Sequence, residues 1–445
     1  MPDPTIDPEK TNAGVYRWYV LGLLTVSAIF SIADRLVLSI LLEDIKAEFS
    51  LSDTELGLLT GLAFALFYVL AGFPIARLAD RSNRKNIVAA SLAFYSAMTA
   101  LCGAAVGFWT LFLARMGVGI GEGGSGPPAV SLLADYFKKK ELARAMSIHT
   151  WGAVLGTGGG LIAGGLLAEL FGWRMAFVLL GLPGIALGLL VYFTMREPKR
   201  GQFTPKALNT VQSSLGDTLA SFLKNKVMIY TCLAWAFVTT IGYAMAIWLA
   251  PIMLRNFEMD TANVGLILGL TFIVGGIPGP ILGGMLVDWL AKYDVRWRAW
   301  IPAIGTAACL PLYYLCLTAG SLTAFLGFFV VGYLFFLFQN GPSIAIIQTC
   351  TASGERAMAF AFALLINNMC GQALGPFVIG FTSDQLAPQY GDQSLNIAVM
   401  VTCLVAGVLA VAFYLLAASA IRRQEEQIAA AEHADEVASA EVRPA

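Results

Sequence analysis

Residues 76–85 read ARLADRSNRK, and this basic stretch joins two long apolar segments of the chain. The apolar segments run over about 54–79 and 86–107. A transmembrane helix needs about 20 apolar residues to cross a hydrocarbon layer about 30 Å thick, so each segment is long enough to cross it. Basic residues in the short loops of membrane proteins collect on the cytoplasmic side. The stretch therefore predicts two transmembrane helices joined by a cytoplasmic loop.

The composition of the whole chain also indicates a membrane protein. Of its 445 residues, 58% are hydrophobic and only 13% are charged, whereas soluble domains carry about 25% charged residues. The net charge of −1 argues against a nucleic-acid partner, which would require a basic excess. Seven cysteines and two histidines are too scattered for a disulfide framework or a metal site. No catalytic motif supports an enzyme, and we expect no cofactor.

Twelve apolar segments long enough to cross a bilayer follow one another along the chain. With a cytoplasmic N-terminus, only Lys46, Arg174 and Arg255 among the basic residues fall in outer loops, while Arg35 and Arg115 fall inside spans. This bias supports both the count and the orientation. The predicted fold class is an all-α membrane protein with twelve transmembrane helices and both termini cytoplasmic. The spans are expected at 18–42, 54–79, 86–107, 109–134, 143–168, 172–194, 227–254, 262–290, 299–318, 322–348, 356–383 and 393–421.

The two halves of the chain resemble each other weakly. Asp80 ends the second span and Asp288 ends the eighth, and a Gly-Pro pair lies in both the fourth and the tenth spans. Two six-helix repeats are a transporter architecture, with the substrate held where the repeats meet. The sequence thus predicts two pseudo-symmetric six-helix bundles. The expected segments are a cytoplasmic N-terminal segment (1–17), an N-terminal bundle (18–194), a cytoplasmic linker (195–226), a C-terminal bundle (227–421) and a cytoplasmic tail (422–445).

The stretch 76–85 resembles the motif between the second and third spans of the major facilitator superfamily. Ala76 and Asn83 stand where that family usually has glycines, and residues 284–292 resemble the degenerate second copy of the motif. The resemblance implies the superfamily fold and a transporter, and it is nearly silent on the substrate.

The same resemblance implies a gate on the cytoplasmic side. In the family, the acidic residue at Asp80 pairs with basic and helix-end groups of the other half when that side is closed. The candidate gate residues are Asp80, Arg81, Arg84 and Asp288.

Four ionisable residues lie well inside the predicted spans: Asp34 and Arg35 in the first, and Arg115 and Glu122 in the fourth. Such a residue at the bilayer centre costs roughly 2.5–3.5 kcal/mol and is by default a functional hypothesis. At a rise of about 1.5 Å per residue, all four lie between the midplane and the outer half. Gly119 lies between Arg115 and Glu122 on one helix face and leaves room for a neighbouring chain. The group is neutral, which fits either a static contact between helices or a functional site.

In the functional interpretation, Asp34 and Glu122 are candidates for proton coupling, because a buried carboxyl beside a guanidinium can change its charge by binding a proton. Arg35 and Arg115 are candidates for holding an anionic headgroup, because a guanidinium matches phosphate and carboxylate. These residues, with 123–127, resemble the Spinster branch of the superfamily, whose members move lysophospholipids or sphingosine-1-phosphate. The resemblance implies a proton-coupled carrier for a lysolipid-like substrate. A carrier for another organic anion or a drug-like amphiphile, a facilitated uniporter and a channel are the alternatives.

The second half offers further candidates for the cavity. Membrane amides either bond across helices or line a cavity, and we expect Asn340 and Asn368, with the aromatic Trp235 and Tyr243, to line it. In the fifth span, one face carries the glycines at 152, 156, 160 and 164, and one half is expected to move on the other along this face. The expected partners are a lipid-like small molecule, protons and the lipid bilayer. We expect a monomer in a bacterial inner membrane.

Overall fold

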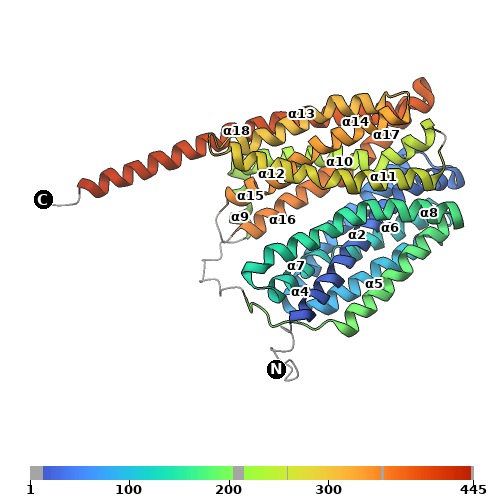
Figure 1. Ribbon diagram of the computed structural model, residues 1–445, viewed down its shortest axis with the longest axis horizontal. Helices are drawn as coiled ribbons and strands as arrows, with labels where there is room; N and C mark the ends of the chain where they lie inside the picture. The colour runs from blue at the N-terminus through green and yellow to red at the C-terminus, as the bar shows by residue number, and fades with distance from the viewer. Residues whose placement is uncertain (1–13, 204–214, 258, 352–354, 442–445) are drawn as a thin grey trace. The chain divides into compact units, whose positions relative to one another are not determined.

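The computed structural model describes residues 14–203, 215–257, 259–351 and 355–441, and all regular elements in these ranges are helical (Figure 1). The first half contains α2 (Gly14–Phe49), α3 (Asp53–Gly57), α4 (Ala63–Arg81), α5 (Arg84–Cys102), α6 (Phe108–Glu122), α7 (Gly126–Tyr136) and α8 (Lys139–Thr194). The second half contains α9 (Leu215–Lys224), α10 (Lys226–Phe257), α11 (Thr261–Gly276), α12 (Pro278–Leu290), α13 (Trp297–Leu317), α14 (Leu322–Phe336), α15 (Asn340–Thr349), α16 (Arg356–Ile366), α17 (Leu374–Tyr390) and α18 (Ser394–Glu441).

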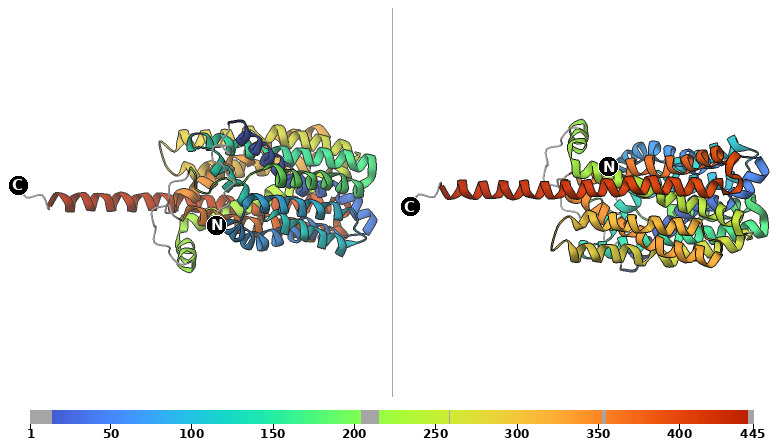
Figure 2. Two further views of the ribbon diagram at one scale, coloured as in Figure 1. Left: turned by 90° about the horizontal axis from the view of Figure 1, so that it is seen from below. Right: turned by 90° about the horizontal axis from the view of Figure 1, so that it is seen from above.

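Two π-helical turns interrupt this pattern, at Leu58–Leu62 before α4 and at Asn367–Ala373 before α17. A π-helical turn admits one more residue than an α-helical turn, and such turns are frequent at functional sites. At the end of the chain, α18 runs without interruption from Ser394 to Glu441 (Figure 2).

Eight helical stretches of the described residues are long and apolar enough to cross a membrane. Two of them, Lys140–Thr194 and Met358–Gln427, each cover two of the spans that the sequence predicts. The third predicted span corresponds to α5, and the fourth corresponds to α6 and α7, which a short turn separates. Every predicted span therefore has a helical counterpart, and the number of membrane crossings stays a prediction.

Local sequence signals explain where several helices begin and bend. Gly172 has a φ of 79° inside α8, at the start of the sixth predicted span. Glycine adopts this left-handed conformation readily because it has no Cβ atom. Asn83 caps α5, since its side-chain oxygen accepts a hydrogen bond from the Asn86 N–H group, and Ser52 forms a capping box with Glu55 at the start of α3. These caps satisfy backbone donors that a helix start leaves without partners.

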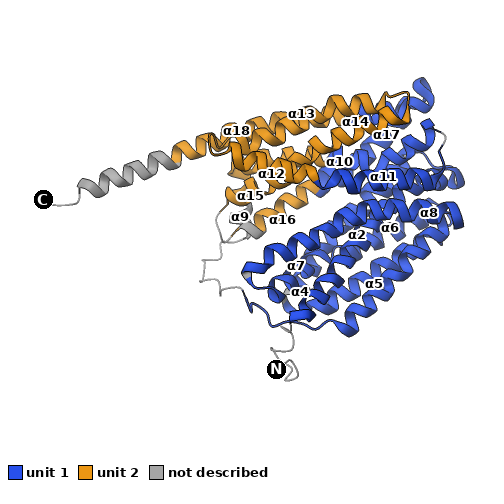
Figure 3. Ribbon diagram, in the orientation of Figure 1, with its two compact units in different colours: residues 1–209, 240–277, 368–402 blue, residues 210–239, 278–367, 403–445 orange. Residues whose placement is uncertain are grey.

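The chain packs into two compact units (Figure 3). Unit 1 contains residues 1–209, 240–277 and 368–402, and unit 2 contains residues 210–239, 278–367 and 403–445. Unit 1 thus joins the first half of the chain to α11, α17 and the C-terminal part of α10. The two bundles that the sequence predicts follow chain order instead, and they stay a prediction.

Within unit 1, the glycine face of α8 packs against α2. A Cβ atom at Gly160 would lie 2.6 Å from the Cα atom of Ala33, and one at Gly156 would lie 2.6 Å from the carbonyl oxygen of Ile29. Gly152 and Gly164 also meet α2. The expectation that this face lies against the other half of the chain is therefore wrong, because its neighbour α2 belongs to the same half.

Two glycines outside that face bring α8 against α11 of the second half. A Cβ atom at Gly158 would lie 2.4 Å from the carbonyl oxygen of Gly269, and one at Gly165 would lie 2.6 Å from that of Thr261. Helices in membranes approach closely where small residues line the contact. The glycines of α8 thus serve two different neighbours, one from each half of the chain.

The contact of α8 with α2 gives a stability prediction. Gly160→Ala should lower the unfolding temperature, because the added methyl group overpacks the contact, at a cost of about 1–3 kcal/mol. Unfolding can be followed in detergent with a thiol-reactive fluorophore, since Cys102 is buried and becomes reactive when the protein unfolds.

Gly22→Ala is the matched control, because a Cβ atom at Gly22 on α2 would have no atom within 4 Å. This variant should unfold at the wild-type temperature or above it, since alanine favours a helix. Equal unfolding temperatures for the two variants would contradict the packing described for Gly160.

Candidate functional site

Glu122, the last residue of α6, is fully buried and forms an ion pair with Arg35 of α2, which is half-buried. Its Oε2 atom accepts hydrogen bonds from Arg35 Nε at 2.7 Å and from Ser31 Oγ at 2.8 Å, and Arg35 Nη2 lies 2.6 Å from the same oxygen. Its Oε1 atom is buried and has no hydrogen-bond partner among the described residues. Three donor groups therefore converge on one carboxylate oxygen, while the other oxygen stays unsatisfied.

Arg115 and Asp34 lie beside this pair. Arg115 is 1% exposed, and its Nη1 atom donates to the backbone oxygen of Asp34 at 3.3 Å. The Asp34 carboxylate accepts a hydrogen bond from the Thr99 hydroxyl of α5. In the part of the chain that the structure describes, Arg115 forms no ion pair with a carboxylate. We call Asp34, Arg35, Arg115 and Glu122 the central charge cluster, and only one of its two possible ion pairs is made.

The close approach of α4 to α6 encloses the central charge cluster. A Cβ atom at Gly119 would lie 2.4 Å from the carbonyl oxygen of Phe64 on α4. The expectation that Gly119 makes room for a neighbouring chain is thus confirmed. Tyr243 of α10 also reaches this place, where it interacts with Arg35. Among the four predicted cavity residues, Tyr243 therefore lies beside the central charge cluster.

The other cavity candidates have different surroundings. Trp235 is 8% exposed and lies in a core cluster of unit 2 with Cys232 and Ile347, and its ring stacks on Phe360. Asn340, also in unit 2, is half-buried, and its side-chain oxygen accepts a hydrogen bond from Gln339 at 2.5 Å. Asn368 is half-buried within the π-helical turn before α17. A role in the cavity stays a prediction for these three residues.

Arg84, one of the predicted gate residues, forms a buried contact inside the first half of the chain. Its Nη1 atom lies 2.6 Å from Asp135 Oδ2 of α7, and its Nε atom lies 2.7 Å from Glu197 Oε1, just after α8. Burial acts to lower the pKa of Arg84, but the hydrogen bonds and charges of Glu197 and Asp135 outweigh it and raise that pKa above its usual value. Arg84 therefore holds three segments of the same half together.

The remaining gate residues are less constrained. Arg81 is exposed at the end of α4, and Asp288 is exposed near the end of α12 in unit 2. The side chain of Asp80 lies outside the described residues. The cytoplasmic gate stays a prediction.

A second group of charges, which we call the outer charge cluster, lies at the end of unit 1 that the predicted topology places outside the cell. It consists of Glu43, Lys46, Asp53 and Arg255. Arg255 Nη2 lies 2.7 Å from Glu43 Oε1 and 2.8 Å from Asp53 Oδ1, and Lys46 Nζ lies 2.5 Å from Asp53 Oδ1. Arg255 belongs to the second half of the chain and both carboxylates to the first. The cluster therefore links the two halves.

Helix ends and glycines strengthen the same link. The Asp384 carboxylate of α17 accepts hydrogen bonds from the backbone N–H groups of Asp53 at 3.0 Å and of Thr54 at 2.8 Å. These are among the first N–H groups of α3, where a negative charge is stabilised. A Cβ atom at Gly61 would lie 2.4 Å from the carbonyl oxygen of Ala373. The backbones of the two π-helical turns are therefore in direct contact.

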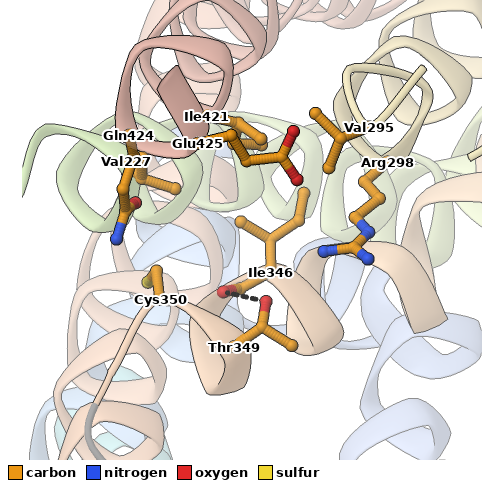
Figure 4. A pocket seen from close by; sticks show the side chains of 9 residues that line it. All are labelled: Val227, Val295, Arg298, Ile346, Thr349, Cys350, Ile421, Gln424 and Glu425. Atoms are coloured by element: carbon orange, nitrogen blue, oxygen red, sulfur yellow. Dashed lines mark hydrogen bonds between the residues drawn. The ribbon is translucent and has the colours of Figure 1, made fainter. Parts of the chain in front are cut away.

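A cavity of about 150 Å³ lies in unit 2 (Figure 4). Arg298 and Glu425 supply its charged lining groups, and the side chains of α15 and α18 provide much of the rest. Its lining residues are Val227, Val295, Arg298, Ile346, Thr349, Cys350, Ile421, Gln424 and Glu425.

The sequence did not indicate the outer charge cluster. Its residues lie near the predicted ends of spans, where charged side chains are common, so their presence there gives little signal. Arg255 and Asp53 are also 202 positions apart. The presence of Arg255 in an outer loop was the available hint, because a buried carboxylate in membrane surroundings needs a basic partner.

Known proteins resemble this chain over most of its length. The family model described as Major Facilitator Superfamily matches residues 23–376. The "MFS-type efflux pump" of Mycolicibacterium smegmatis is 32% identical, over 95% of this chain and 98% of the relative. The "Sphingosine-1-phosphate transporter SPNS2" of Danio rerio is 27% identical, over 84% of this chain and 77% of the relative. The crystal structure of a bacterial homologue of the human lysosomal transporter Spinster, in an inward-facing and unoccupied conformation, is 28% identical with a TM-score of 0.81, and the match covers 92% of this chain and 98% of that one.

The buried contact of Arg84 predicts a large loss of stability in Arg84→Ala. Removing the guanidinium leaves two carboxylates without their partner, and breaking a buried pair in this way costs about 3–5 kcal/mol. Arg81→Ala is the matched control, because Arg81 is exposed. Thermal unfolding in detergent should separate the two variants clearly. If both unfold at the wild-type temperature, Arg84 does not hold these segments together.

Proposed function

The chain belongs to the major facilitator superfamily, in its Spinster branch, and we propose that it moves a lysolipid-like amphiphile by proton-coupled alternating access. It is a multi-pass membrane transporter of small molecules and not an enzyme. The central charge cluster is the observation that carries the finer proposal. We further propose that the protein acts as a monomer in a bacterial inner membrane.

Glu122 is the proposed proton site, and its two oxygens give the reason. Oε2 accepts hydrogen bonds from Arg35 and Ser31, while the buried Oε1 has no hydrogen-bond partner among the described residues. A buried carboxylate oxygen that lacks a hydrogen-bond partner is costly, and binding a proton there removes the charge of the group. Protonation also weakens the attraction of Glu122 for Arg35. The guanidinium then becomes available to another anion.

Arg35 is the proposed headgroup residue. Its side chain is 15% exposed, whereas that of Glu122 is fully buried, so Arg35 can meet a ligand without leaving the cluster. The planar guanidinium matches a phosphate or a carboxylate through two parallel hydrogen bonds. Arg115 is 1% exposed and faces the backbone of Asp34, so its charge would assist headgroup binding from behind Arg35. Asp34 is the second proposed proton-coupling residue.

The nature of the substrate is inferred from the relatives. SPNS2 of Danio rerio is named for sphingosine-1-phosphate, which combines one anionic phosphate with one long apolar chain. The central charge cluster suits such a headgroup, and Tyr243 beside Arg35 offers an aromatic surface near it. The efflux pump of Mycolicibacterium smegmatis, which is more similar in sequence, favours a second candidate. That candidate is a carrier for another organic anion or drug-like amphiphile, and a facilitated uniporter is its uncoupled form.

Alternating access requires a contact that closes one side and later opens. The outer charge cluster is our proposed outer gate, since Arg255 of the second half bonds Glu43 and Asp53 of the first. A closed outer end belongs to an inward-facing carrier. Arg84, in contrast, bonds partners of its own half, so the two halves can separate without breaking that contact.

The experiment that tests the function is an uptake assay with the purified protein in liposomes under an imposed proton gradient. Lysophospholipids and sphingosine-1-phosphate are compared with sugars and small organic acids. We expect the gradient to drive movement of the single-chain lipids. In Glu122→Gln, the dependence of lipid movement on pH should be largely lost, because the amide cannot bind the proton.

Glu48→Gln is the control for this assay. Glu48 accepts hydrogen bonds from Arg174 and from Trp173, away from the central charge cluster, so this variant should keep the wild-type pH profile. Full pH dependence in Glu122→Gln would exclude Glu122 as the proton site. Uptake of a small soluble anion, with no effect on lipids, would replace the lysolipid by the second candidate.

The outer gate predicts a change in accessibility. In Arg255→Ala the carboxylates of Glu43 and Asp53 lose their link to the second half, so the outer end should open more often. A cysteine at Ser383, which is buried and donates to Asp53 at 2.7 Å, should then react several-fold faster with a membrane-impermeant maleimide added outside.

Arg174→Ala provides the matched control for this labelling. Arg174 is also an outer-loop residue and pairs with Glu48, but both partners lie in the first half of the chain. Its removal should leave the labelling rate unchanged. Equal rates in the two variants would show that Arg255 does not hold the outer end closed.

A further inference from the structure

Phe64 of α4 contacts both arginines of the central charge cluster. Its side chain is 1% exposed, and its ring centroid lies 4.7 Å from Arg35 Cζ and 5.6 Å from Arg115 Cζ. One turn further along the helix, the ring of Tyr68 lies 5.0 Å from Arg35 Cζ. The two rings are stacked, with centroids 5.7 Å apart. Two aromatic faces thus meet the guanidinium of Arg35, and one of them also meets Arg115.

The backbone explains how a single side chain reaches both guanidiniums. The π-helical turn Leu58–Leu62 ends two residues before Phe64, and its wider turn changes which side chains of α4 face α2 and α6. Gly119 lies between Arg115 and Glu122 on α6, and its missing Cβ atom would come 2.4 Å from the carbonyl oxygen of Phe64. This close approach puts the Phe64 ring at the level of the cluster.

A guanidinium is attracted to the face of an aromatic ring, and more strongly where water is excluded. This attraction does not depend on the charge of Glu122, because the ring does not titrate. The ion pair of Arg35 with Glu122, in contrast, loses its electrostatic part when the carboxyl binds a proton. The rings of Phe64 and Tyr68, together with Tyr243 of α10, are therefore partners that can keep Arg35 in place after Glu122 has become neutral.

The same ring also matters for Arg115, which has fewer partners than Arg35 among the described residues. It is almost completely buried, and in the described part of the chain its guanidinium donates to a backbone oxygen and forms no ion pair with a carboxylate. Its Nε atom has no hydrogen-bond partner there. The Phe64 ring is thus one of the few groups near Arg115 that stabilise a cation.

We propose that Phe64 is a positioning residue of the transport cycle: its ring holds Arg35 and Arg115, with Tyr68 as a second support for Arg35, while Glu122 exchanges its proton. This inference rests on the proposed role of Glu122. With the ring in place, Arg35 stays near Glu122 in both protonation states and presents the same geometry to an anionic headgroup. Without it, Arg35 becomes mobile and stabilises the Glu122 anion less.

The first test is the pH profile of uptake in Phe64→Leu, which keeps an apolar side chain but removes the aromatic face. The midpoint of the profile should shift upward by about one pH unit, which corresponds to a tenfold change in an equilibrium constant. Phe64→Tyr keeps the ring and should return the midpoint to within a few tenths of a unit of wild type. Tyr68→Leu should shift the midpoint in the same direction by less, and Tyr68→Phe should leave it unchanged.

Phe177→Leu is the control for a purely structural effect. Phe177 is fully buried in α8 and packs edge-on against Trp173, so its truncation removes a similar amount of core packing without touching the cluster. It should lower the unfolding temperature and leave the pH midpoint unchanged. A midpoint shift in Phe177→Leu as large as that in Phe64→Leu would overturn the proposal, as would identical profiles for Phe64→Leu and Phe64→Tyr.

The second test does not depend on transport. A double-mutant cycle of Phe64→Leu and Arg35→Gln is measured by thermal unfolding in the Glu122→Gln background, where the carboxylate charge is absent. If the ring holds Arg35, Arg35→Gln should lower the unfolding temperature by several degrees more with Phe64 present than with Leu at that position. Additive effects would overturn the positioning role even if uptake is proton-coupled. Coupling in the cycle, together with wild-type uptake that ignores pH, would reject the proposed proton site and keep the ring contact.

Discussion

The ion pair between Arg35 and Glu122 is the constraint from which the arrangement of unit 1 follows. A charge in the hydrocarbon region must be neutralised by a neighbour that is held in place, so the helices that carry the two residues cannot separate. The pair brings α2 against α6, and Gly119 of α6 then admits the backbone of Phe64. The glycines of α8 pack closely on α2, largely against its backbone. The contacts of two further helices, α4 and α8, are thus built around the helices that carry this buried pair.

Each of three arginines in unit 1 is neutralised differently, and the difference separates structure from function. Arg84 lies between two carboxylates of its own half, and Arg255 lies between two carboxylates of the opposite half. Removing Arg84 leaves two carboxylates without their cation, whereas removing Arg255 leaves Lys46 beside Asp53. The contact of Arg84 can persist through a movement of the two halves, whereas that of Arg255 must break if they separate. Arg35 is the third case, because its partner Glu122 can lose its charge.

The sequence alone was sufficient to predict features that depend on a single segment of the chain. The apolar lengths, the basic loops and the four buried charges predicted the helices and the residues of the central charge cluster, and Gly119 could be interpreted because it lies between two of those charges. Contacts between distant segments could not be derived. Phe64 is one of 28 phenylalanines in the chain. Its position beside the cluster depends on a π-helical turn that cannot be predicted from the types of residue in it. The glycine face of α8 was assigned to the wrong neighbour. The spacing of the glycines shows that they share one face, but it does not show which helix packs against that face.

The asymmetry between Arg35 and Arg115 shows why the cluster need not be a static contact. With two carboxylates and two guanidiniums, the group could form two complete ion pairs, and such an arrangement would have little reason to change. Instead, among the described residues, Glu122 accepts hydrogen bonds on Oε2 and none on Oε1, and Arg115 donates to the backbone of Asp34. Hydrogen-bonding capacity is therefore left over on both the acidic and the basic residues. A proton or an anionic headgroup is the kind of ligand that fills such positions, and each would change the partner that Arg35 prefers.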